Sequence, residues 1–249
     1  MARLEPRAGD LRVGFARLFD GAPILPKQMA LLRATLPTSP VTLLATLGAW
    51  RSGKTSAEIL GSLSSIVQNP WTRDYGANRP CTLMITETTT GLYDALINVW
   101  PEGLIAHEVR SPSWDILVPN GHVVALRTAA GSLEGKTVCT TIIDEVHKLR
   151  SKRNYINYRA RASDGRAAKN LTICAGLPID NGWLKQEFDR VDDPKRLTLY
   201  MPTHENVYLP PGYVDDLRSS CSAKEAKTLL SAEWQTYEGA IYDDLDSSK

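Results

Sequence analysis

The chain has 249 residues, of which 43% are hydrophobic and 23% are charged, as in a typical globular protein. Its 29 lysines and arginines against 28 aspartates and glutamates leave a net charge of +1. This balance excludes a histone-like basic protein and an acidic tail, so any nucleic-acid surface must be local.

The sequence gives no sign of a membrane segment, a secretion signal or a zinc site. No apolar run approaches the ~18 residues that cross a bilayer, and Glu5, Pro6 and Asp10 interrupt the segment where a secretion signal is apolar. The four cysteines lie far apart without a CxxC pair, which favours free thiols in a reducing cytosol over a zinc site.

The first predicted element is a helix that begins at Pro26, a residue suited to a first helical turn. Met29, Leu32 and Leu36 supply its apolar positions, and Pro37 ends it. From there on, apolar strands alternate with helical segments, which predicts an α/β fold with a mostly parallel sheet flanked by helices. We expect strands at 41–47, 81–86, 138–143, 171–175 and 196–201. We expect helices at 55–67, 90–100, 150–162, 181–191 and 223–234.

Two further features concern the organisation of the chain. Asn120-Gly121 between the apolar runs of residues 115–127 predicts a β-hairpin. After Pro210-Pro211-Gly212 the composition changes, and residues 215–249 hold eight acidic and four basic residues. We therefore expect a core at 1–205 and a small lid or linker subdomain at 206–249.

Residues 48–55, GAWRSGKT, match the phosphate-loop pattern G-x-x-x-x-G-K-[ST], with a strand before them and a helix after them. In such a loop the glycines let backbone N–H groups surround a phosphate, and the helix N-terminus adds a favourable dipole. Lys54 can reach the β- and γ-phosphates, and Thr55 can hold Mg²⁺. The predicted nucleotide-binding residues here are Gly48, Arg51, Ser52, Gly53, Lys54, Thr55 and Ser56.

The strand at 138–143 ends in two acids, Asp144 and Glu145. Asp144 is predicted to hold Mg²⁺ through water, and Glu145 to polarise the attacking water as the catalytic residue. A lone acid at a strand end is usually a helix N-cap, but an adjacent pair indicates an NTPase that hydrolyses its nucleotide. His147 follows, with two interpretations open: packing in the next turn, or a coupling role.

Two weaker signals accompany these motifs. Cys174, Ala175 and Gly176 end a strand with small residues, which let backbone approach a ligand closely. In an open α/β sheet, ligands bind outside the carboxyl ends of the strands, so one crevice could collect these residues, the phosphate loop and the acidic pair. Gln28 precedes the first strand, and its amide could pair with adenine or simply lie exposed on its helix.

In this order, Gln28, GAWRSGKT, TTIIDEVH and TICAG resemble the ATPase domain of the large terminase subunit of tailed bacteriophages. That domain is the motor that pumps DNA into a procapsid. The resemblance covers residues 26–242, including GSLEGK at 131–136 and YEGAIY at 237–242, where such proteins pass into a nuclease domain. It implies a P-loop ATPase of the additional-strand, catalytic-glutamate type. Gln28 would contact adenine, Lys54 and Glu145 would be catalytic, and residues 174–176 would form the coupling motif.

The resemblance also implies ATP as substrate, Mg²⁺ as cofactor and a location in the host cytoplasm. The implied partners are double-stranded DNA, the portal of the procapsid, a small terminase subunit and further copies in a ring. In isolation we expect a monomer, because no long apolar stripe would drive association.

The sequence departs from the family in three places. Trp50 stands where many of these motors carry an arginine, with Arg51 one residue later. Glu134 stands where an arginine finger is often found, which leaves Arg127 and Lys136 as the nearest basic candidates. The acids near the end of the chain form no nuclease constellation, so we expect an ATPase domain alone, without nuclease activity.

Other interpretations stay open. Residues 148–169 hold eight basic residues and one acid, which fits either a solvated helix or a surface facing DNA or a neighbouring subunit. The runner-up function is a superfamily 2-like DNA helicase or translocase, which should carry a second RecA-like domain. A nucleotide-gated scaffold is the non-enzymatic alternative, and Lys54 together with Glu145 argues against it.

Overall fold

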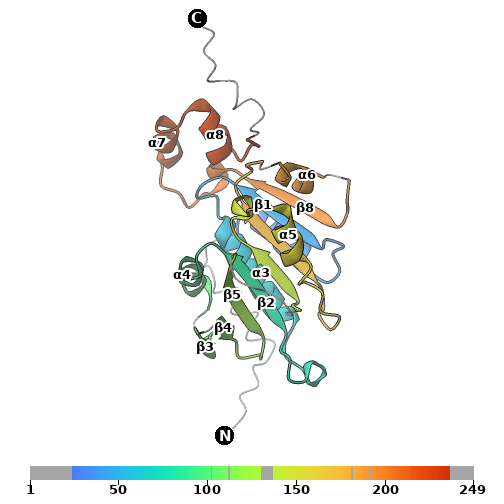
Figure 1. Cartoon of the computed structure of the whole chain (residues 1–249). Helices are drawn as coiled ribbons and strands as arrows, with labels where there is room; N and C mark the ends of the chain where they lie inside the picture. Colours follow the sequence, from blue (N-terminus) through green and yellow to red (C-terminus); the bar gives the residue numbers. More distant parts are fainter. Residues whose placement is uncertain are drawn as a thin grey trace, which may run out of the picture.

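The computed structural model describes residues 24–101, 103–111, 113–129, 137–180, 182–190 and 192–235. These residues build one eight-stranded sheet with the order β3-β4-β5-β2-β6-β7-β1-β8 (Figure 1). The strands are β1 (Leu43–Gly48), β2 (Cys81–Thr86), β3 (His107–Val109), β4 (Trp114–Leu117), β5 (Val123–Thr128), β6 (Thr140–Ile143), β7 (Leu171–Gly176) and β8 (Arg196–Met201). The six strands from β5 to β8 in this order are parallel, whereas the pairs β3–β4 and β4–β5 at one edge are antiparallel.

Helices cover both faces of the sheet, as the alternation of the sequence predicts. The α-helices are α2 (Pro26–Thr35), α3 (Lys54–Gln68), α4 (Thr89–Val99), α5 (Lys152–Arg159), α6 (Leu184–Phe188), α7 (Tyr213–Ser219) and α8 (Ala223–Leu229). Short 3-10 turns are η1 (Arg73–Tyr75), η2 (Val146–Lys148) and η3 (Thr203–Glu205). No helix in these ranges is both long and apolar enough to cross a membrane.

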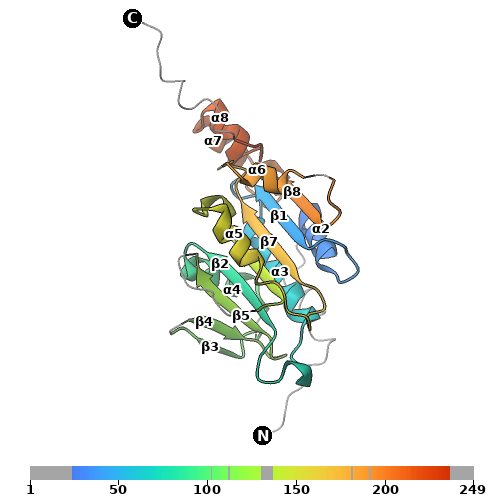
Figure 2. The ribbon, with the colours of Figure 1, turned by 45° about the vertical axis from the view of Figure 1, so that its right-hand side comes forward.

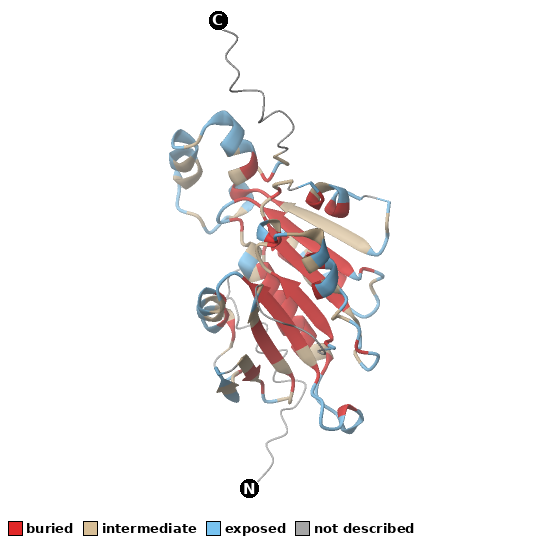
Figure 3. Cartoon of the chain, in the orientation of Figure 1, coloured by how far each residue is buried: buried red, intermediate tan, exposed pale blue. Residues whose placement is uncertain are grey.

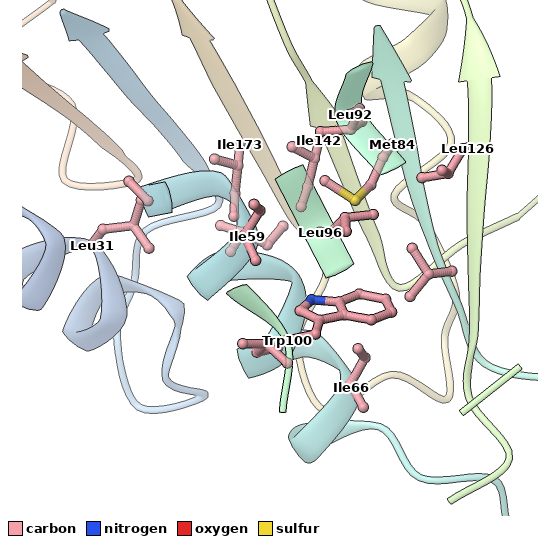
Figure 4. Packing of buried hydrophobic residues seen from close by; sticks show 14 of the residues in the cluster. Leu31, Ile59, Ile66, Met84, Leu92, Leu96, Trp100, Leu126, Ile142 and Ile173 are labelled. Atoms are coloured by element: carbon pink, nitrogen blue, oxygen red, sulfur yellow. The ribbon is translucent and has the colours of Figure 1, made fainter. Parts of the chain in front are cut away.

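The core has two layers, one on each face of the sheet. Because successive side chains of a strand point to opposite faces, Met84 packs with α2, α3 and α4 on one face (Figure 4), whereas Leu83 and Ile85 pack with α5 and α6 on the other. The central strands are buried throughout, as Figure 3 shows, so their uninterrupted apolar runs reflect burial on both faces. The middle of these strands is therefore closed to solvent, and a ligand can meet the sheet at the strand ends.

Strand order brings three of these ends together. β7 lies between β1 and β6 and is parallel to both, with Leu47 opposite Gly176 and Ile143 opposite Cys174. The segments that follow β1, β6 and β7 therefore leave the sheet at the same edge. The α7–α8 pair lies beyond this edge (Figures 1 and 2), and the Trp50 N–H donates to the Leu229 carbonyl at 2.8 Å.

Most predicted elements are confirmed, including the hairpin of β4 and β5, but the apolar face of the first helix is wrong. Met29 and Leu36 are exposed, whereas Gln28, Leu31 and Ala34 are buried. The reason is that α2 packs against α3, where Leu31 approaches Gly61. The position of α3 therefore determines which face of α2 is buried.

Several elements are shorter than predicted. β6 begins only at Thr140 because Val138 instead forms an isolated bridge with Ala162. The predicted helices at 150–162, 181–191 and 223–234 contract to α5, α6 and α8, and the sequence analysis did not anticipate β3 or α7. The four cysteines form no disulfide; Cys139 and Cys174 are buried, as expected, whereas Cys81 and Cys221 are half-buried.

His122 is fully buried and held at both ring nitrogens. Nδ1 lies 2.8 Å from the Asn69 carbonyl, to which it must donate, and Nε2 lies 2.9 Å from Thr82 Oγ1. Burial lowers the pKa of His122 to about 4, below the ~6.5 of an unfolded chain. His122 is therefore a neutral residue of the core that connects the segment just before β5 to β2 and to the end of α3.

This burial predicts a loss of stability in acid. Between pH 6.5 and 4 the unfolded chain binds a proton at His122 that the folded chain does not, so the free energy of unfolding falls as pH falls. The full effect is about 3 kcal/mol at about 1.4 kcal/mol per pKa unit. Urea unfolding of wild type and His122→Gln at several pH values should show a shallower pH dependence for the variant. Parallel curves would contradict the assignment.

Candidate functional site

The loop between β1 and α3 has a conformation that only its glycines permit at two positions. A Cβ on Gly48 would lie 2.5 Å from Ser52 Oγ and 2.7 Å from Lys54 Cγ. Gly53 has a φ of 88°, in the left-handed region that favours glycine, and Arg51 is left-handed as well at 53°. The chain therefore turns tightly around its own backbone before α3 begins at Lys54.

Hydrogen bonds connect the backbone of the loop to the end of β8 and the segment that follows it. The Ala49 N–H donates to the Met201 carbonyl at 2.9 Å. Thr203 Oγ1 donates to the Trp50 carbonyl at 2.7 Å, and Asn206 Nδ2 donates to the Arg51 carbonyl at 2.6 Å. Sequence reasoning missed these supporting residues, since nothing in a single sequence links positions ~150 residues apart.

Lys54 lies inside the loop. Its Nζ donates to the Ala49 carbonyl at 2.7 Å, and Ser52 Oγ donates to the same oxygen at 2.9 Å. Burial lowers the pKa of Lys54, and nearby carboxylates, Glu145 foremost, partly oppose this. Thr55 is exposed and Ser56 half-buried at the start of α3. The ammonium is therefore partly desolvated and bonded to the backbone of the loop itself.

Gln28 is buried, so the interpretation of an exposed helical glutamine is wrong. Its Oε1 accepts the Leu25 N–H at 3.1 Å, and its Nε2 donates to the Gly53 carbonyl at 3.3 Å. The Gln28 amide thus joins α2 to the loop at Gly53. Contact between Gln28 and adenine stays a prediction.

Asp144 and Glu145 follow β6 at the same edge of the sheet. Asp144 Oδ2 accepts a hydrogen bond from Thr86 Oγ1 at 3.2 Å. Burial and the neighbouring Glu145 raise the pKa of Asp144 to about 6. A carboxylate whose negative charge is disfavoured in this way gains from a cation, and Mg²⁺ in NTPases takes few protein ligands besides phosphates and water. Asp144 therefore fits a cation ligand, and a Mg²⁺ site formed with Thr55 stays a prediction.

Glu145 has an unusual backbone and two basic neighbours. Its φ of 51° is left-handed, which is uncommon for a residue other than glycine and points to a functional constraint. Oε2 lies 3.3 Å from His147 Nε2 and 3.7 Å from Lys148 Nζ, and Lys148 also pairs with Glu87 at 2.7 Å. The carboxylate is half-exposed, as a group that meets water must be.

Glu58 is a further carboxyl near the site, and the sequence analysis missed it. It lies one turn after Lys54 on α3, fully buried, and neither carboxyl oxygen has a hydrogen-bond partner within the described ranges. Burial, with Asp144 second, raises its pKa well above the usual range. An acid directly flanked by the apolar residues Ala57, Ile59 and Leu60 was the available signal.

The end of β7 is pressed against η2. Cys174 and Ala175 are buried, and a Cβ on Gly176 would lie 2.9 Å from His147 Nδ1 and 3.3 Å from the Val146 nitrogen. Only glycine fits this contact without displacing its neighbours. The three small residues therefore bring β7 into contact with the turn that carries the acidic pair.

The candidate arginine finger receives no support. Arg127 forms an ion pair with Asp115 and donates to the Trp114 carbonyl at 2.9 Å, so its guanidinium is committed to β4. Glu134 and Lys136 lie outside the described residues, as do the GSLEGK and YEGAIY segments. Arg51 is an exposed residue of the loop itself.

Much of the basic stretch has structural partners. Lys152 and Arg159 face the buried Glu187, Arg166 pairs with Asp164, and Lys169 donates to three carbonyls at the end of α2 and just beyond it. These bonds join α5 to α6 and attach the loop before β7 to the end of α2. Arg150 and Arg153 remain exposed.

Among solved structures, phage large terminases have a fold similar to that of this chain. The large terminase of a thermophilic bacteriophage superposes with a TM-score of 0.66 at 20% identity, over 91% of this chain and 57% of that one. The HK97 bacteriophage large terminase gives 0.65 at 13% identity, over 92% and 56%. The Thermus phage P74-26 large terminase ATPase domain gives 0.57 at 12% identity, over 89% and 97%. No protein-family model and no curated protein matches the chain.

The fold is therefore the α/β fold of phage large terminase ATPase domains, as the sequence resemblance suggested. The chain spans little more than half the length of the thermophilic-phage and HK97 proteins but nearly the whole of the P74-26 domain. Related structures of the thermophilic-phage protein are complexes with ATP-gamma-S and with ADP.

Proposed function

We propose that this chain is the ATPase domain of a phage DNA-packaging motor and hydrolyses ATP to move double-stranded DNA into a procapsid. The observation that carries the proposal is the meeting of the phosphate loop, the acidic pair and the end of β7 at one edge of a parallel sheet. The nucleotide complexes of the thermophilic-phage large terminase support ATP as the substrate.

Each residue then has a part in hydrolysis. The loop at 48–55 and Lys54 hold the phosphates, and Thr55 and Asp144 hold Mg²⁺, which neutralises charge on the phosphate oxygens. Glu145 orients and polarises the attacking water. The position of β7 between β1 and β6 supports the additional-strand, catalytic-glutamate class. Gln28 would contact adenine as well as the loop.

The same proposal includes an assembly. Residues 206–249 would act as a lid or linker, which the hydrogen bonds that join the loop at 50–51 to Asn206 and Leu229 support. Double-stranded DNA, the portal and a small terminase subunit are the proposed partners, in a ring of copies in the host cytoplasm. Residues 174–176 would couple hydrolysis to movement.

An ATPase assay separates this proposal from its rivals. The steady-state rate should rise when procapsids and linear double-stranded DNA are added together, and it should rise more steeply than protein concentration if copies complete each other's sites. The Glu145→Gln protein is the baseline. Unwinding of a forked duplex would instead favour a helicase, and ATP binding without turnover under every condition would favour a nucleotide-gated scaffold.

A further inference from the structure

His147 contacts both the segment after β7 and Glu145, the proposed water-activating residue after β6. Its side chain is 8% exposed. The Leu177 N–H, just after β7, donates to His147 Nδ1 at 3.2 Å, and Nε2 on the other side of the ring lies 3.3 Å from Glu145 Oε2. One imidazole thus contacts the backbone after β7 and the carboxylate after β6.

The backbone contact determines which ring nitrogen carries the proton. A backbone N–H can only donate, so Nδ1 must be the unprotonated acceptor. In a neutral imidazole the proton then lies on Nε2, which faces the Glu145 carboxylate. Burial lowers the pKa of His147, which agrees with a neutral ring. Leu177 therefore sets the tautomer that presents an N–H to Glu145.

The surroundings fix the ring as well as its proton. Gly176 leaves no room for a Cβ beside Nδ1, and the same missing side chain keeps the Val146 backbone close. Glu145 itself has a left-handed backbone, with a φ of 51°, directly between β6 and η2. The orientation of the carboxylate thus depends on contacts made after the strand as well as on β6.

We infer that His147 is a positioning residue for Glu145: it accepts the Leu177 N–H and holds the carboxylate where it can activate water. This inference rests on the proposed function of Glu145. It follows that a shift of the β7 end relative to η2 changes the orientation of Glu145 without any change in the phosphate loop. The ring is a physical link between residues 174–177 and the hydrolytic step.

Three substitutions of His147 separate its contacts. Leucine keeps apolar bulk and removes both polar contacts. Asparagine can still accept the Leu177 N–H but is too short to reach Glu145. Glutamine extends an amide N–H toward Glu145 and is the conservative replacement. His107→Asn on the edge strand β3, where the histidine is exposed, is the matched control.

ATP turnover and ATP-gamma-S affinity are measured on the full chain. We expect His147→Leu and His147→Asn to lower kcat about 10- to 100-fold, the usual effect of losing a group that orients a functional residue. ATP-gamma-S affinity should stay within about threefold, and His147→Gln should recover most of kcat. Gly176→Ala, which presses on the ring from β7, should lower kcat in the same way.

The possible failures are distinguishable. Wild-type kcat in His147→Asn, a glutamine variant no better than leucine, or an equal loss of ATP-gamma-S affinity would each overturn the positioning role. If Glu145→Gln retains turnover, the proposed function of Glu145 fails first. If Glu145→Gln lowers kcat to a measurable residual rate, adding His147→Asn should lower that rate no further, because the two residues act as one unit. An additional loss would place His147 in a separate role and overturn the inference.

Discussion

Lys54→Ala will lose ATP affinity by about two orders of magnitude or more. The ammonium lies within the loop at 2.7 Å from the Ala49 carbonyl, where an incoming phosphate would replace that partner. A hydrogen bond to a charged group is worth about 1.5–3 kcal/mol, and about 1.4 kcal/mol is a tenfold change in affinity. Loss of contacts to two phosphates therefore gives at least this effect.

The fold should survive the substitution. Burial lowers the pKa of Lys54, so the folded protein disfavours this charge, and removing it adds no electrostatic cost. Lys54→Met, which keeps the stem packed beside Gly48, is a second variant. Lys195→Ala is the matched control, because this exposed lysine lies at the opposite end of β1. Calorimetry that shows wild-type ATP affinity in Lys54→Ala would refute the phosphate-loop assignment.

Glu145→Gln will bind ATP and fail to turn it over, with kcat lower by about 10²–10⁴-fold, the usual contribution of a general base. Glutamine keeps the length of the side chain and leaves an oxygen for the His147 Nε2–H. It removes the negative charge that polarises water. ATP-gamma-S affinity should be retained or slightly raised, because the loop and Lys54 are untouched.

Single-turnover hydrolysis compared with ATP-gamma-S binding tests this separation. Glu108→Gln is the matched control, because it makes the same chemical change on the edge strand β3, which is separated from β6 in the sheet. Normal turnover in Glu145→Gln would move the catalytic role elsewhere. Loss of binding together with turnover would mean that Glu145 maintains the loop instead of acting on water.

The sequence by itself determined the local features of this protein. The pattern of residues 48–55 specifies its own turn, since Gly48 and Gly53 are required by close contact and by a positive φ. The apolar runs of β2, β7 and β8 are long enough for their strands to begin where predicted. Asn120-Gly121 likewise specified the hairpin, because hairpin turns depend on a few neighbouring residues.

Only the tertiary structure decided how these pieces support one another. Leu31 is buried in place of Met29 because α3 lies beside α2, and Gln28 braces Gly53 across 25 residues. The bond from Leu177 to His147 spans 30 residues, and that from Asn206 to Arg51 spans 155. Such contacts depend on strand order and helix packing, which arise from the burial of the whole sheet. A single sequence shows each of these residues but not which of them come into contact.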